Sequence, residues 1–195
     1  MRSKTRKLSA SSNLGKHSLS FNTAAVKPIF GPMQLQIADI VNRFFFYAQD
    51  SQDILFDPTA KLKSFMVCDM EDVAVSIRNG IKLPCVLLQV PVYEKEGDVD
   101  AAFEHVECSF IVLNKAAIGD YAGRMLAYSA CKQIADQFIY RMIQDADEYF
   151  DGAMPKTSEG PVGPIGDSIF GWGVNFGFQQ AIGTAIDPAK WGAAS

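Results

Sequence analysis

The strongest hydrophobic pattern in the chain is the run from Ser168 to Gln179, where large apolar residues occupy every second position: Phe170, Trp172, Val174, Phe176 and Phe178. A period of two is typical of a β-strand that turns one face to the core. The opposite face carries Gly171, Gly173, Asn175 and Gly177. Glycine inside a strand indicates that something packs closely on it. The pattern predicts a strand with a partner on each face, and it makes Gly171, Gly173 and Gly177 candidate subunit-interface residues.

Two other segments have helical spacing. The first follows Gly31-Pro32 and spans residues 33–49, since proline favours the first position of a helix. The second spans residues 121–149 and has an apolar stripe. The stripe includes Met125, Phe138, Ile139 and Met142. We expect this stripe to form the core together with Phe170, Trp172, Val174, Phe176 and Phe178.

The remaining apolar segments predict short strands. Residues 62–68 and 73–77 precede an Arg-Asn-Gly turn signal and could pair with each other. Residues 83–93 carry a proline near each end, which favours an edge strand or one with irregular ends. A charged turn then leads into residues 102–113, so a long β-hairpin is expected. Residues 152–167 are rich in glycine and proline and are expected to form a loop.

Together these elements predict an α+β fold, with a mixed or antiparallel sheet of about four to five strands packed on one long helix. An N-terminal helix and an extended basic N-terminal arm complete it. We expect residues 1–30 to form the arm, 31–182 a single α+β domain and 183–195 a C-terminal tail. A chain of 195 residues can bury a sizeable core in one such domain.

The N-terminal segment differs from the rest of the chain in its charge. Six of the 18 basic residues precede Asp39 and no acidic residue does, which leaves 12 basic and 22 acidic residues for the remainder. An arm of this charge can bind a polyanion or dock on the acidic body of a neighbouring identical subunit. The arm lacks the interleaved aromatic residues of single-strand binders, which favours protein docking. The further candidate interface residues are Arg2, Lys4, Arg6, Lys7, Lys16 and, in the tail, Trp191.

The sequence contains no strong motif for catalysis, cofactor binding or metal binding. The four cysteines are widely spaced and the two histidines lie far apart, so we expect buried free thiols in a reducing compartment and no metal site. The glycine-rich stretch lacks the Gly-Lys-Ser/Thr ending of a phosphate-binding loop, and no nucleophile elbow is present. No apolar run reaches the roughly 18 residues of a membrane span. We expect no catalytic residue, no cofactor and no membrane association.

The order of an N-terminal amphipathic helix, a hairpin-rich sheet, one long helix and a final aromatic strand (Trp172, Val174, Phe176, Phe178) resembles that of bacteriophage tail-terminator and tail-completion (neck) proteins. The resemblance covers about residues 33–182. It implies a hexameric ring that caps the tail tube and joins it to the head-proximal connector and other tail or neck proteins. It also implies that DNA passes through the lumen without specific binding, that the protein is not an enzyme, and that it resides in the virion after assembly in the bacterial host cytoplasm.

Two other classes of function stay open at this point. A small-ligand-binding or enzymatic α+β domain would have a pocket between the long helix and the sheet and would use His105 or Arg124. In that case His105, Glu107, Arg124 and Asp136 should converge in one cleft with apolar walls. A nucleic-acid-binding module would work through the arm, but the acidic body would repel a polyanion.

Overall fold

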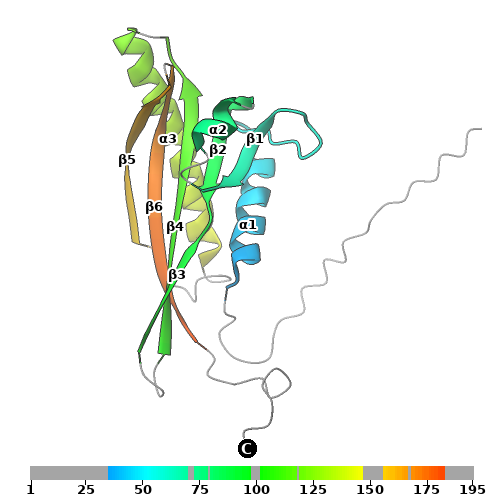
Figure 1. Cartoon of the computed structure of the whole chain (residues 1–195), viewed down its shortest axis with the longest axis vertical. Coiled ribbons are helices and arrows are strands. Elements are labelled where there is room, and N and C mark those ends of the chain that lie inside the picture. The colour runs from blue at the N-terminus through cyan, green and yellow to red at the C-terminus, as the bar shows by residue number, and fades with distance from the viewer. Residues whose placement is uncertain are drawn as a thin grey trace, which may run out of the picture. The chain divides into compact units, whose positions relative to one another are not determined.

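The computed structural model describes residues 35–69, 73–78, 80–97, 102–117, 119–146, 156–166 and 168–182. Within these ranges the chain is α+β, with six strands in one mixed sheet (Figure 1). In chain order the elements are α1 (Ile37–Asp50), β1 (Lys63–Cys68), α2 (Val73–Arg78), β2 (Ile81–Gln89), β3 (Val92–Gly97), β4 (Ala102–Lys115), α3 (Tyr121–Gln144), β5 (Lys156–Ile165) and β6 (Ile169–Ala181). The expected four to five strands are therefore too few.

The sheet is built around β4, which pairs along nearly its whole length with β6, from Phe103 opposite Ala181 to Lys115 opposite Ile169. The strand order is β1-β2-β4-β6-β5, and β3 pairs with β4 as well. Because β2 pairs with the second half of β4 and β3 with its first half, β2 and β3 follow one another along the same side of β4.

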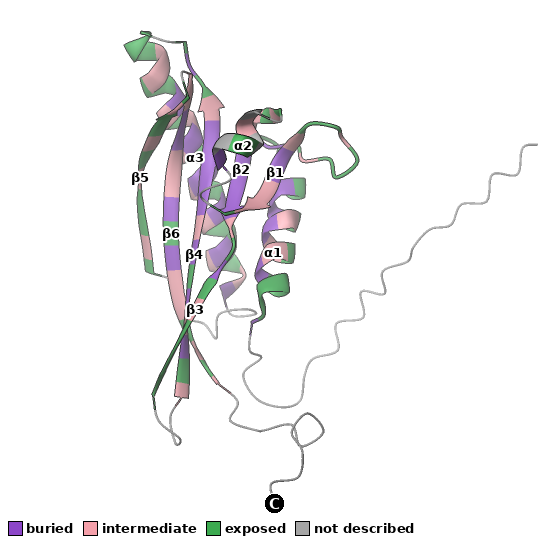
Figure 2. Ribbon diagram, in the orientation of Figure 1, coloured by how far each residue is buried: buried purple, intermediate pink, exposed green. Residues whose placement is uncertain are grey.

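The two long helices pack on one face of this sheet. In α1 the buried residues Ile40, Phe44, Tyr47 and Ala48 recur at helical spacing, and in α3 the buried residues include Cys131, Ala135, Phe138 and Met142. Both sets meet Val106, Phe110, Val174 and Phe176 of the sheet in one hydrophobic cluster. The core thus lies between the helices and the β4–β6 pair, and Figure 2 shows buried residues concentrated on β2, β4 and the middle of β6.

Local signals explain where the helices begin. Asp120 accepts a hydrogen bond from the Gly123 N–H at 2.8 Å, a side-chain cap for the first turn of α3. At α1 the Gln36 N–H donates to Asp39 Oδ2 at 2.9 Å. Helix α1 begins at Ile37 rather than Met33, and residues 31–34 lie outside the described ranges.

Several sequence-based expectations for the strands are wrong. Residues 73–77 belong to the helix α2, because Val73 and Ile77 are one helical turn apart and both pack on the same cluster. β1 pairs in parallel with β2 and not with this segment, and the connection through α2 allows the parallel pairing. Residues 83–93 form parts of two strands, β2 and β3, separated at Val90 and Pro91.

The expected loop at residues 152–167 contains the strand β5. Its residues Pro161 and Pro164 fit because β5 is the last strand of the sheet order, where a missing N–H need not break a ladder on both sides. The second half of this segment is irregular, since the β5–β6 register shifts between Val162 and Ile165. Proline and glycine content alone therefore does not exclude an edge strand.

Candidate functional site

The face of the sheet opposite α1 and α3 is divided into two halves. One half is covered by the chain itself: Val73 of α2 packs with Cys85, Leu87, Ile111 and Leu113 in a second hydrophobic cluster. The other half carries the outward-facing residues of β3, the first half of β4 and the second half of β6, and it holds a groove of about 820 Å³. We call this hollow the open-face groove.

The alternation of the strands explains the polar floor of the open-face groove. Because Val106, Cys108 and Phe110 point to the helices, the intervening residues of β4 point outward, and the same parity applies to β6. The floor residues are His105, Glu107, Ser109, Asn175, Gly177 and Gln179. The sides are formed by Gln89 of β2, Glu94 and Glu96 of β3, and Lys156 and Ser158 of β5.

The groove has more negative than positive charge. It contains Glu94, Glu96 and Glu107 but only one lysine, Lys156. His105 Nε2 lies 3.1 Å from Glu96 Oε2 and 3.5 Å from Gln179 Nε2. Within the described parts of the chain, neither Glu94 nor Glu107 forms a salt bridge. The groove therefore presents two exposed carboxylates that have no cationic partner among the described residues.

The predicted glycine face is filled partly by this chain, which corrects one expectation. A Cβ atom on Gly171 would lie 2.3 Å from the Val112 carbonyl oxygen, and one on Gly173 would lie 2.9 Å from Val162 Cγ2. Gly171 is buried, so its partner is the backbone of β4 rather than a neighbouring subunit. Gly177 differs, because it forms part of the groove floor and its nearest atom for a Cβ is the Val106 carbonyl oxygen at 3.4 Å.

The candidate core residues lie mostly where expected. Phe170, Val174, Phe176, Phe138 and Met142 are buried, while Trp172, Phe178 and Ile139 are partly buried against the main cluster. Met125 is the exception, since 45% of it is exposed. Its position on α3 precedes the part of the helix that covers the sheet, and Leu126 beside it is 71% exposed.

The four polar residues of the ligand-pocket alternative do not converge. His105 and Glu107 line the open-face groove, whereas Asp136 lies on α3 against the opposite face of the sheet. The Arg124 guanidinium lies over the rings of Tyr121 and Phe170, 5.3 and 5.6 Å from their centroids. The space between α3 and the sheet is filled by the main hydrophobic cluster.

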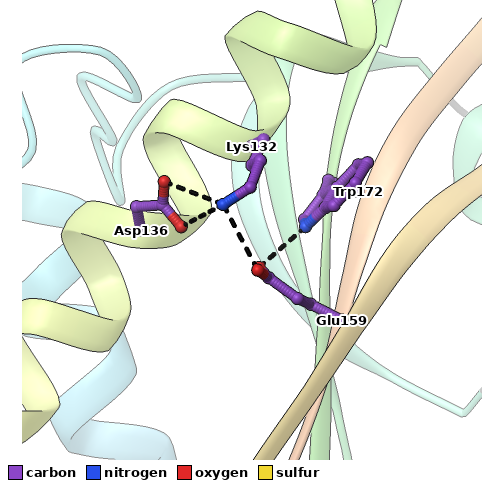
Figure 3. A network of polar contacts seen from close by, with 4 residues as sticks. All are labelled: Lys132, Asp136, Glu159 and Trp172. Atoms are coloured by element: carbon purple, nitrogen blue, oxygen red, sulfur yellow. Dashed lines mark hydrogen bonds and ion pairs between the residues drawn. The ribbon is translucent and has the colours of Figure 1, made fainter.

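Asp136 instead belongs to a polar network that joins β5 to α3 (Figure 3). Lys132 Nζ lies 2.8 Å from Asp136 Oδ1 and 3.2 Å from Glu159 Oε1, and the Trp172 indole N–H donates to Glu159 Oε2 at 2.9 Å. The Trp172 hydrogen bond and the nearby Lys132 lower the pKa of Glu159. The pKa of Lys132 is raised, chiefly by its hydrogen bond to Asp136. This network has a structural explanation and needs no ligand.

A set of hydrogen bonds that was not predicted from the sequence fixes the chain just before α1. The Leu35 N–H donates to Gln180 Oε1 at 2.8 Å, and Gln180 Nε2 donates to the Leu35 carbonyl at 3.2 Å and to Glu104 Oε2 at 2.8 Å. Glu104 is 5% exposed. The alternation along the strand could have indicated this contact. Gln180 follows Phe178 in the inward-facing series of β6, and a polar residue in such a position requires hydrogen-bond partners.

Burial raises the pKa of Cys85, Cys108 and Cys131 to about 12. Among the residues that the structure describes, no group of three or more His, Cys, Asp and Glu side chains could hold a metal ion, and no helix is long and apolar enough to cross a membrane. Arg2, Lys4, Arg6, Lys7, Lys16 and Trp191 lie outside the described residues.

Comparison with known proteins adds no assignment to this geometry, since no protein-family model and no curated protein matches the chain.

Proposed function

We propose that this chain is a structural subunit of a bacteriophage tail or neck ring, similar to tail terminators, that caps the tail tube and joins it to the head-proximal connector. The observation that carries the proposal is the half of the sheet face that no described helix or strand covers. Its outer face, from β3 across β4 and β6 to β5, offers a continuous surface next to a half that the chain covers with its own α2. A surface of this kind suits contact with another folded chain.

The exposed apolar residues of that surface support an assembly role. Val92 of β3 and Phe103 of β4 face outward and are 50% and 40% exposed. Buried aromatic and aliphatic residues at the centre of an interface contribute most of its affinity, while polar residues around them set the orientation. Val92 and Phe103 border the groove and would supply apolar contacts at its rim, while the groove residues would supply the polar contacts.

The ends of the sheet give a second reason to expect a ring. β1 and β5 are the terminal strands of the sheet order, so each has a hydrogen-bonding edge that no described strand occupies. Two different surfaces at opposite ends of one subunit permit a head-to-tail contact, and such contacts form a closed ring when the rotation between subunits closes. Pro161 and Pro164 limit strand pairing along the second half of β5, so the contact would involve its first half and the adjoining sheet face.

The charge of the body agrees with a lumen through which DNA passes. After the six basic residues of the N-terminal segment, acidic residues outnumber basic ones by 22 to 12. A surface of net negative charge repels phosphates, so it does not hold DNA in place. The subunit would act in the virion, after assembly in the host cytoplasm, by contacting identical copies and other tail or neck proteins.

The scattered positions of the polar residues weigh against the ligand-pocket alternative. Arg124 and Asp136 already have intramolecular partners at two separate places on α3, away from the groove. Only His105 and Glu107 share a cavity. That cavity is open to solvent and its lining is about as polar as it is apolar, whereas ligand pockets enclose most of the ligand and are mostly apolar.

Electron microscopy of the purified full-length protein tests the proposal. We expect ring-shaped particles with a central opening and one dominant rotational symmetry. Uniform particles of single-chain size, both alone and with tail-tube proteins, would contradict the ring. The charge variant Asp50→Lys, on the exposed face of α1, is the control and should leave the particles unchanged.

A further inference from the structure

We infer that the open-face groove is the docking site for the basic N-terminal segment, residues 1–34, of a neighbouring copy of this chain. The inference rests on the proposed assembly, because it names the segment and the surface that would hold two copies together. Its support comes from the charge of the groove, the point where residue 35 is fixed, and the space above Gly177.

Charge complementarity is the first argument. The N-terminal segment contains six lysine and arginine residues and no acidic residue. The groove contains three glutamates and one lysine, and two of those glutamates, Glu94 and Glu107, form no salt bridge with the described residues. Carboxylates that line a concave surface attract a cationic peptide and raise its association rate.

The position of Leu35 is the second argument. Both backbone polar groups of Leu35 are held by the Gln180 side chain, so the start of α1 is fixed near the end of β6. Gln180 and its partner Glu104 face the helices, since they alternate with the outward-facing Gln179 and His105. Leu35, the first described residue, therefore lies on the side of the sheet opposite the groove. A contact with the chain's own groove would require the segment to pass around the edge of its own sheet, so we favour the groove of a neighbouring copy.

Length permits this contact. An extended chain spans roughly 3.3 Å per residue, so 34 residues reach about 110 Å, which exceeds the diameter of a domain of this size. A segment that crosses to a neighbour also explains how assembly could gain affinity without a large apolar interface, because many linked contacts add in a closed ring.

The third argument is the shape of the groove floor. On the outward face, Gly177 of β6 pairs with Glu107 of β4 on one side and with Lys156 of β5 on the other. Since Gly177 has no side chain, the backbone between two charged residues stays open to an approaching peptide. Its φ lies outside the left-handed region, so turn geometry does not explain the glycine. A peptide lysine or arginine that enters here could contact Glu107 directly.

A carbodiimide cross-linking experiment on the full-length protein tests the inference. This reagent joins a lysine amine to a carboxylate only where the two are in contact. Isotope-labelled and unlabelled copies are mixed before assembly, and cross-linked peptides are identified by mass spectrometry. We expect cross-links from Lys4, Lys7 or Lys16 to Glu94, Glu96 or Glu107 that combine labelled with unlabelled peptides.

Two variants make the result specific to the groove. Gly177→Leu fills the floor but keeps every glutamate, and it should lower the mixed cross-links by about tenfold, which corresponds to roughly 1.4 kcal/mol of binding free energy. Gly160→Leu is the matched control, because Gly160 lies on the outward face of β5 outside the groove and nothing lies within 4 Å of an added Cβ. The control should keep the cross-links of the unmodified protein.

The outcomes separate this inference from the proposed function. Cross-links that join only peptides of the same copy, or arm cross-links that avoid the groove, overturn the inference even if rings form. Cross-links that survive Gly177→Leu unchanged overturn it as well. Mixed groove cross-links in a protein that forms no ring would support the inference and contradict the ring.

Discussion

At the scale of single residues, the three glycines of β6 have different explanations. At Gly171 a Cβ atom would clash with the backbone of β4, and at Gly173 it would clash with the Val162 side chain. Gly177 faces the open-face groove. Alternation in the sequence gives all three the same orientation, but only the register with β4 and β5 distinguishes them. Packing inside the chain thus accounts for the first two, and Gly177 is the one that stays available for a partner.

Gly171→Ala should destabilise the fold. The new Cβ would lie 2.3 Å from the Val112 carbonyl oxygen and 2.6 Å from Leu113 Cδ2, so β4 and β6 would have to move apart. Overpacking of this kind costs about 1–3 kcal/mol of unfolding free energy. Urea denaturation measures the change, and Gly160→Ala, which meets no atom within 4 Å, should stay within about 0.5 kcal/mol of the unmodified protein. Equal losses for both variants would contradict the register.

Glu159 should make stability depend on pH. Its folded-state pKa is lowered, first by the hydrogen bond from Trp172 and then by Lys132, so its contribution is present above the usual glutamate value of 4.5. That contribution is lost as the pH falls through the lowered folded-state pKa. Because a third of the Glu159 side chain is exposed (33%), we expect Glu159→Gln to cost only about 0.5 kcal/mol at neutral pH and less in acid.

Unfolding free energies at neutral and acidic pH test this expectation, and Trp172→Phe provides the control. In the Trp172→Phe background Glu159 loses the indole donor and keeps only Lys132, so the pH-dependent cost of Glu159→Gln should shrink. A cost that is the same at both pH values would show that the Glu159 carboxylate does not contribute through this network.

At the scale of elements, α1 and α3 are joined by one polar cluster as well as by the core. The Tyr47 hydroxyl donates to Asp145 Oδ2 at 2.9 Å, and the Arg43 guanidinium lies 3.3 Å from the same oxygen. Burial and the hydrogen bond to Asp145 raise the pKa of Tyr47, so the phenol stays protonated. Arg141 approaches the other carboxylate oxygen at 3.6 Å. The carboxylate at the end of α3 therefore fixes the distance between the two helices.

Asp145→Ala should weaken the contact between α1 and α3 and lower the free energy of unfolding. The variant leaves the Tyr47 hydroxyl without its acceptor in a largely buried position, and such a loss costs about 1–3 kcal/mol. Thermal and urea unfolding measure the effect, and Asp50→Ala on the exposed side of α1 is the control, with an expected change within about 0.5 kcal/mol. If both variants unfold alike, the cluster does not hold the helices together.

The elements with strong periodicity could be predicted from the sequence, and the weaker ones could not. The spacing of apolar residues identifies α1, β4 and β6 because each has a long face in the core. The apolar stripe of α3 is weaker, since Met125, Leu126 and Tyr140 are exposed. The segment of α2 has only six residues, too few to separate a period of two from one of 3.6, and tertiary packing decides it. β5 was missed because Pro161 and Pro164 resemble a loop, although an edge strand tolerates both.

The open-face groove was harder to predict for a different reason. The polar parity of His105, Glu107 and Ser109 is visible in the sequence, but the other residues come from β2, β3, β5 and β6. Which strands become neighbours depends on the parallel crossover through α2 and on the position of β5, neither of which the sequence pattern predicts. The groove therefore depends on the strand order, and local sequence patterns do not reveal that order.

The whole molecule combines a half of a sheet face that no described element covers, the outer edges of the terminal strands β1 and β5, and a basic N-terminal segment next to an acidic remainder. Each feature favours contact with further copies, and the charges of the segment and the groove are complementary. Surface burial supplies affinity only after the costs of association are met, so a ring with several linked contacts is expected to be more stable than a single pair. We therefore propose that this chain works as an assembled ring.

Native mass spectrometry of the purified full-length protein tests that claim most directly, because it counts the chains in each particle. We expect one dominant species of six chains, with the same count over a range of protein concentrations. A single-chain mass at every concentration, in the presence and absence of tail-tube proteins, would contradict it.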